Sequence, residues 1–228
     1  MADTAAQTET VTEPAAEAAM SDVARRVAEL RKVAQNSPAT AADAAWGWFR
    51  ELGDRAKADR ESGSADLDEL FRLGNAPTAI DGQTEGILVV PLIQPVLDKG
   101  LGLLTGAWMP WLGKRFDRGA QLGDNTLTSS TRFVGKLLWP LYGMREYGSN
   151  LAAFDFETRV EPGKLDPGTD VLVIDYFPIE KNPNFIIRSI RDELVEITPG
   201  ANLGKILWRS GDDDYTNIGF FALRSTNS

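Results

Sequence analysis

The chain of 228 residues contains no histidine and no cysteine. Histidine titrates near neutral pH and is the commonest metal ligand, and cysteine supplies the thiolate nucleophile. Their absence excludes thiol catalysis, histidine-dependent catalytic triads and histidine-ligated haem. Without thiolate or imidazole, a metal site would need carboxylates for all of its protein ligands. We therefore expect no metal and no cofactor, while chemistry that uses carboxylates stays open.

Positive charge and long apolar runs are also scarce. The 24 Lys and Arg residues face 33 Asp and Glu residues, which gives a net charge of −9. Such a balance disfavours nucleic acid and anionic membrane surfaces, because both bind through clustered basic side chains. The longest uncharged apolar run, residues 86–97, is interrupted by two prolines and is too short for a membrane helix. We expect no nucleic-acid partner and no transmembrane segment.

The first 20 residues are acidic and contain few large apolar side chains. They hold four Asp or Glu residues and no Lys or Arg. Such a segment buries too little apolar surface to offset its chain entropy, so we predict a disordered acidic tail over residues 1–20. Its charge is the reverse of the basic start of a secretory signal, which favours a cytoplasmic protein.

A helical hairpin is predicted over residues 21–60. Ser21 is a typical N-cap, and the apolar residues after it recur at spacings of three and four. Trp48 lies off the apolar stripe of the second helix, so it either contacts the main domain or meets a protein partner. Residues 61–64 (Glu-Ser-Gly-Ser) have the composition of a linker, and residues 66–73 are predicted as a short helix.

The pattern after Gly74 changes to strands, which form a predicted domain over residues 66–228. Pro199-Gly200 suits a type II turn between two of them. Residues 184–193 are ambiguous, and their β-branched content favours a strand. Strands are predicted at residues 86–90, 151–160, 171–177, 194–197, 203–208 and 218–223. Short antiparallel strands at this spacing indicate an α+β protein, mainly β, whose sheet forms a sandwich or a closed barrel.

The densest local feature is the aromatic and basic stretch at residues 108–116. Together with Trp139 it would line a cavity for an apolar ligand, while a basic side chain holds an anionic head group. A core filled with tryptophan is the alternative explanation. The candidate wall residues are Trp108, Trp111, Trp139 and Tyr176, and the candidate basic residues are Lys114, Arg132 and Lys205.

Two carboxylates lie among hydrophobic residues. Asp175 interrupts an apolar run, and Asp192 stands between hydrophobic neighbours. A partly buried carboxylate can act as a general acid or base. The alternative is a structural ion pair with an arginine on a neighbouring strand.

Short motifs spread over residues 66–224 resemble the bacterial GXWXG-type domains. They are Leu67-Asp68-Glu69-Leu70-Phe71, Gly86, Trp111 to Phe116, Asp192-Glu193-Leu194, Leu203-Gly204-Lys205 and Phe220 to Leu223. The name-giving motif departs from the pattern, since Pro110 stands where the second glycine belongs. The resemblance implies a lipocalin-like (calycin) barrel. Haem-binding relatives place a histidine on iron, which this chain cannot do.

Three functions follow as hypotheses. The first is the binding of a small hydrophobic or amphipathic, lipid-like molecule inside the barrel. The second is a non-metal enzyme of the same barrel class with Asp175 or Asp192 as base. The third is a protein-interaction module that uses residues 21–60, with an exposed Trp48 as its discriminating feature.

Overall fold

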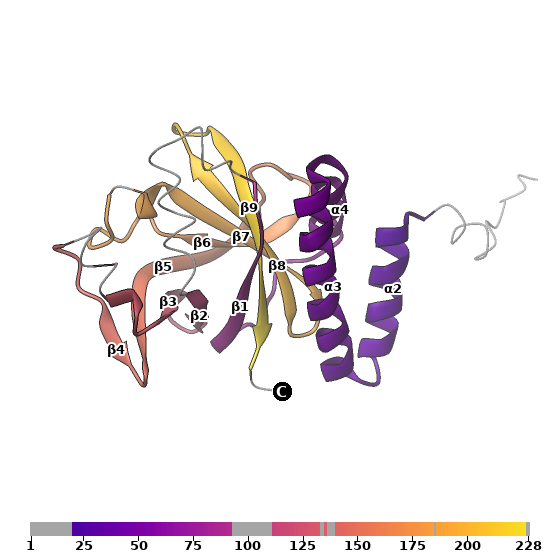
Figure 1. Cartoon of the computed structure of the whole chain (residues 1–228), viewed down its shortest axis with the longest axis horizontal. Helices are drawn as coiled ribbons and strands as arrows, with labels where there is room; N and C mark the ends of the chain where they lie inside the picture. Colours follow the sequence, from indigo (N-terminus) through magenta and orange to yellow (C-terminus); the bar gives the residue numbers. More distant parts are fainter. Residues whose placement is uncertain (1–19, 93–110, 133–134, 136–139, 185, 227–228) are drawn as a thin grey trace, which may run out of the picture.

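The computed structural model describes residues 20–92, 111–132, 135, 140–184 and 186–226, so all but the last residue of the predicted tail lies outside them. Three helices come first and antiparallel strands follow (Figure 1). The helices are α2 (Asp22–Ala34), α3 (Pro38–Ala58) and α4 (Arg60–Arg72). The strands are β1 (Gly82–Pro91), β2 (Trp111–Asp117), β3 (Leu122–Thr128), β4 (Arg145–Tyr147), β5 (Asn150–Pro162), β6 (Asp170–Asp175), β7 (Ile190–Thr198), β8 (Ala201–Arg209) and β9 (Tyr215–Ser225).

Local sequence signals explain where the helices begin. The side chain of Ser21 accepts a hydrogen bond from the backbone N–H of Ala24 at 3.0 Å, so the predicted N-cap is confirmed. The linker predicted at residues 61–64 is wrong, because these residues lie inside α4. A Cβ at Gly63 would come within 2.4 Å of the backbone of Ala56 in α3. The glycine therefore permits two helices to approach closely.

The strands close into a barrel of eight. The hydrogen-bonded order runs from β3 through β2, β1, β9, β8, β7 and β6 to β5, and a pairing of β3 with β5 closes the ring. The short β4 pairs with β5 beside the ring. The antiparallel barrel with preceding helices that the sequence predicts is thus confirmed.

Two connections show how the sequence shapes the barrel. Gly200 has a φ of +81° between β7 and β8, as the predicted turn requires. Ahead of β7, Ile187–Ser189 form the 3-10 turn η1, so the strand begins at Ile190. The predicted strand over 184–193 is therefore wrong for its first half, where Ile186 has a φ of +78° that extended pairing does not allow.

The barrel wall separates two apolar cores. Side chains alternate along each strand, so Phe220 packs outward against the helices and Phe221 packs inward. Helix α3 contacts β1, β7, β8 and β9, and it lies between α2 and the barrel (Figure 1). Trp48 is buried in the outer core, and the Arg26 guanidinium of α2 lies 4.8 Å from its ring centroid. The exposed Trp48 that an interaction module would need is not observed.

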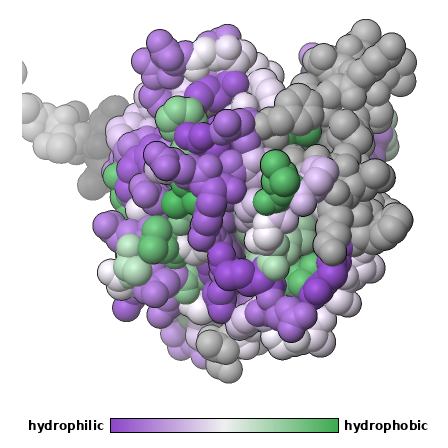
Figure 2. Space-filling model, turned by 90° about the vertical axis from the view of Figure 1, so that its left-hand side faces the viewer, coloured by the Kyte–Doolittle hydropathy of each residue, from purple (hydrophilic) through white to green (hydrophobic). Residues whose placement is uncertain are grey.

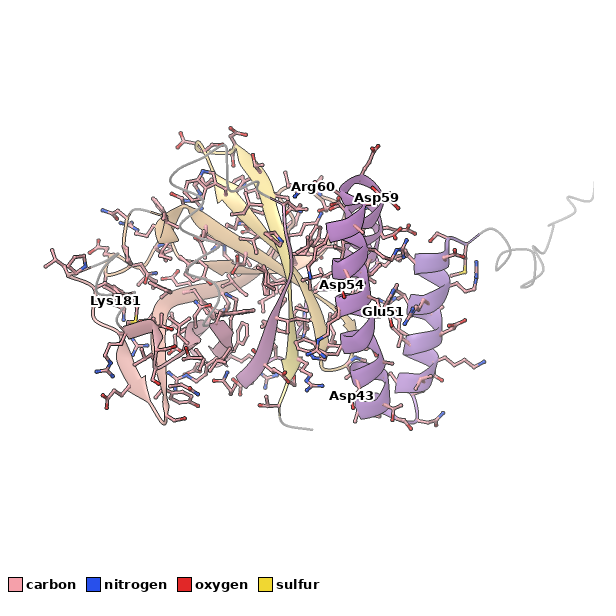
Figure 3. All side chains as sticks on the ribbon, in the orientation of Figure 1. Asp43, Glu51, Asp54, Asp59, Arg60 and Lys181 are labelled. Atoms are coloured by element: carbon pink, nitrogen blue, oxygen red, sulfur yellow. The ribbon has the colours of Figure 1, made fainter. Side chains whose placement is uncertain are left out.

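The surface carries dispersed charge. In Figure 3 the labelled acidic residues of α3 lie along the helical layer, and Lys181 lies at the far side of the barrel. Asp43, Glu51 and Asp54 are each paired with a basic side chain, and Arg60 donates to the carbonyl of Leu92. On the face shown in Figure 2, hydrophobic residues form separate spots between hydrophilic ones.

No helix in the described parts of the chain is long and apolar enough to cross a membrane. A cytoplasmic location stays a prediction from composition.

Candidate functional site

Four polar side chains from four parts of the barrel wall meet in its interior. They are Lys114 of β2, Asn125 of β3, Tyr176 directly after β6 and Asp192 of β7. Lys114 Nζ lies 2.9 Å from Asp192 Oδ2, 3.0 Å from Asn125 Oδ1 and 2.5 Å from the Tyr176 hydroxyl. The Tyr176 hydroxyl in turn donates to Asp192 Oδ2 at 3.1 Å. We call these four residues the interior cluster.

Asn125 links the interior cluster to the wall. Its Nδ2 donates to the Tyr176 hydroxyl at 3.1 Å and to the carbonyl of Phe154 at 3.0 Å. Its Oδ1 accepts from the indole N–H of Trp111 at 3.1 Å. Phe154 has a φ of +53° where the β3–β5 register shifts, and this bulge turns its carbonyl toward Asn125.

Aromatic rings surround the ammonium group of Lys114. Its Nζ lies between 5.2 and 5.6 Å from the ring centroids of Trp111, Phe156, Tyr176 and Phe221. Ring faces attract cations, and this attraction strengthens where water is excluded. The interior cluster is therefore a polar centre in an apolar, aromatic environment.

Burial sets the electrostatics of the interior cluster. Desolvation lowers the pKa of Lys114, although the carboxylate of Asp192 acts in the opposite direction. Desolvation also raises the pKa of Tyr176 well above its ordinary value, and the neighbouring Asp192 adds to the effect. Both side chains are less than 5% exposed. The mutual contacts and the surrounding ring faces offset the cost of removing these groups from water.

The structure brings together four of the residues singled out from the sequence, namely Trp111, Lys114, Tyr176 and Asp192. Trp108 and Trp139 lie outside the described residues. Arg132 pairs with Glu146 at 2.9 Å on the surface.

Lys205 lies on the outer face of the barrel, on the opposite side of the wall from the interior cluster. Its Nζ is 2.6 Å from Asp166 and 2.6 Å from Asp68 of α4. The side chain also lies over the ring of Phe71 in α4. Lys205 therefore joins the helical layer to the barrel.

The two candidate carboxylates lie on opposite faces. Asp175 points outward and pairs with Arg159 at 3.1 Å, which is the structural alternative considered from the sequence. Asp192 points inward, so a proton-transfer role within the barrel would use Asp192.

Sequence reasoning missed Asn125, Phe156 and Phe221. Asn125 carried no signal, because a single amide in a short strand points to either face with equal ease. For Phe220 and Phe221, alternation indicates that one ring points inward, and the closure of the barrel decides which.

The hydroxyl of Tyr142, near the interior cluster, should make the stability of the protein depend on pH. It stacks on Phe154 with centroids 5.2 Å apart, and burial raises the pKa of its hydroxyl to about 12. Between pH 10 and 12 the unfolded chain ionises this group and the folded chain does not, so stability falls as pH rises through that window. Between pH 9 and pH 11 we expect the free energy of unfolding of Tyr142→Phe to fall by about 1 kcal/mol less than that of the native chain. Urea unfolding at both pH values measures this, and equal losses for the two proteins would contradict it.

A small surface pocket lies apart from the interior cluster. Its lining residues include Pro77, Thr78, Phe116, Asp117, Arg118 and Leu172. Of its two charged residues, Arg118 donates to the carbonyl of Thr78 and Asp117 accepts from the backbone N–H of Ala120. Nothing in this pocket marks it as a site for chemistry. Among the described residues no group of three or more acidic side chains is arranged to hold a metal ion.

The fold and the interior cluster together define a closed antiparallel barrel protein with a buried polar centre. No protein-family model matches the chain, and no curated protein matches it. The chain is similar to the crystal structure of a protein from Thermomonospora curvata, with 16% sequence identity and a TM-score of 0.43. That similarity covers 78% of this chain and 99% of the other.

Proposed function

We propose that the protein binds a small hydrophobic or amphipathic molecule inside its barrel, as a calycin-like binding protein does. The observation that carries the proposal is the interior cluster of Lys114, Asn125, Tyr176 and Asp192 among aromatic rings. The interior of an eight-stranded barrel is wide enough either to be filled by side chains or to hold one small ligand. The ligand's apolar part would contact the rings and its polar part would reach the interior cluster.

The cost of burying the Lys114–Asp192 pair favours a binding site over a purely structural role. Burying a lysine and an aspartate costs several kcal/mol per ion before their attraction offsets it. Apolar side chains of similar volume would stabilise a barrel core equally well. A buried ion pair in an otherwise apolar interior is therefore a candidate for a group kept for recognition or chemistry. The resemblance to GXWXG-type domains implies a calycin-like barrel but no particular ligand, and it stays a prediction.

The proposal is tested with the purified full chain and 2-methylnaphthalene, an apolar probe. Equilibrium dialysis is expected to show saturable binding of one probe per chain. Trp111→Leu removes an aromatic wall and should weaken binding about fivefold, as expected for the loss of about 1 kcal/mol of aromatic contact. The matched control is Tyr147→Leu, which removes an aromatic ring that lies over Arg115 outside the interior cluster. Non-saturable binding, or equal losses in both variants, would refute the proposal.

A further inference from the structure

One oxygen of the interior cluster is unpartnered within the described parts of the chain. Asp192 Oδ2 accepts from Lys114 and from Tyr176, whereas Asp192 Oδ1 is buried and has no hydrogen-bond partner among the residues that the structure describes. A buried carboxylate oxygen without a donor is costly, and native proteins rarely leave one in that state. This oxygen is therefore free to accept a hydrogen bond from a group that the described residues do not supply.

The ammonium group of Lys114, by contrast, has an acceptor for each of its N–H bonds. It has three N–H bonds, and three acceptors lie within hydrogen-bond distance of Nζ, on Asp192, Asn125 and Tyr176. Its charge is matched by that of Asp192. An anionic head group would find no free N–H on Lys114 and would lie close to a carboxylate.

From these two observations we propose that the ligand's polar end is an uncharged hydrogen-bond donor, a hydroxyl or an N–H, which donates to Asp192 Oδ1. The apolar body of the ligand lies against the rings of Trp111, Phe156 and Phe221. This inference rests on the proposed function and specifies its ligand class. It replaces the anionic head group that the sequence suggested for Lys114.

The test compares three naphthalene probes that share one ring system and differ at one substituent. They are 2-naphthol, which carries a donor; 2-naphthoate, which carries a carboxylate; and 2-methylnaphthalene, which carries neither. For the native chain at pH 7 we expect 2-naphthol to bind about tenfold more tightly than 2-methylnaphthalene, because hydrogen bonds to charged groups are the strong ones. The 2-naphthoate should bind most weakly.

Asp192→Asn is expected to invert the order of the two polar probes. The amide places an N–H where an acceptor stood, and it leaves the charge of Lys114 unmatched, so both changes favour a carboxylate. The 2-naphthoate should then bind more tightly than 2-naphthol. The control Asp175→Asn alters a carboxylate that points outward to Arg159, and it should keep the native order.

A second variant keeps the inference testable if Asp192→Asn does not fold. Lys114→Met combined with Asp192→Val replaces both charges with apolar side chains and should bind 2-naphthol and 2-methylnaphthalene with affinities within about twofold of each other, while 2-naphthoate stays the weakest because no cation remains to match its charge. Tighter binding of 2-naphthoate than of 2-naphthol by the native chain would overturn the inference, as would a tenfold preference for 2-naphthol that survives in the double variant. Failure of all three probes to bind would instead overturn the proposed function itself.

Discussion

Lys114→Met is expected to lower the free energy of unfolding by about 3–5 kcal/mol, one of the two largest effects expected for this protein. The substitution keeps the length of the side chain but leaves Asp192 as an uncompensated charge in the barrel interior. Asp192 is 3% exposed, so water cannot replace the lost ammonium group. Chemical denaturation of the native chain and the variant at pH 7 measures the difference.

The double variant Lys114→Met/Asp192→Val separates the cost of an unpaired charge from the value of the pair. We expect it to differ from the native chain by about 1 kcal/mol or less, because a buried ion pair and an apolar pair of similar volume have similar net effects on stability. Asn125 still donates to the Tyr176 hydroxyl in this variant, so the remaining cluster stays hydrogen-bonded. If the losses of the two single substitutions simply add in the double variant, the interior pair is not coupled as the structure indicates.

Removal of helices α2 to α4 is expected to abolish the soluble, folded state of the barrel. A chain that begins at residue 73 would expose the apolar outer face of four strands, which the helices now cover. The buried residues of that face include Val89, Val195, Ile197, Leu203 and Phe220. An exposed apolar face of this extent leads to aggregation. Size-exclusion chromatography and circular dichroism measure the outcome.

The control for this deletion is a chain that begins at Met20, which retains all three helices and should fold as the full chain does. A monomeric residue 73–228 fragment that unfolds cooperatively would show that the barrel needs no helical layer. An exposed ion pair between the two layers adds little to this attachment. Asp43 and Arg224 join α3 to β9, yet the Asp43 side chain is 73% exposed, and such pairs contribute about 0–1 kcal/mol.

Local patterns in the sequence were sufficient to predict where several helices and turns lie. Ser21 begins α2 because a side-chain oxygen and a following apolar stripe act within one helical turn. Pro199-Gly200 defines the β7–β8 turn for the same reason, since only neighbouring residues decide the backbone angles there. The linker at residues 61–64 was wrong because the same small residues also allow two helices to pack closely.

The candidate site could not be predicted from short stretches of sequence, because its residues come from strands far apart in the chain. Alternation predicts that Lys114 and Arg115 point to opposite faces, and that Lys205 shares a face with neither of its sequence neighbours. It does not predict which face becomes the interior. Lys114 and Lys205 are both buried lysines in strands, and one lies inside the barrel while the other lies under α4.

By itself, the sequence determined the class of the fold, the helices before it and the kinds of chemistry that an absence of histidine and cysteine leaves open. The tertiary structure alone decided that Lys114 meets Asp192, that Asp175 is turned outward to Arg159, and that Asn125 enters the interior cluster. The physical reason is that strand periodicity acts over two residues, whereas the closing pair of β3 and β5 and the register of each ladder join residues far apart in the chain.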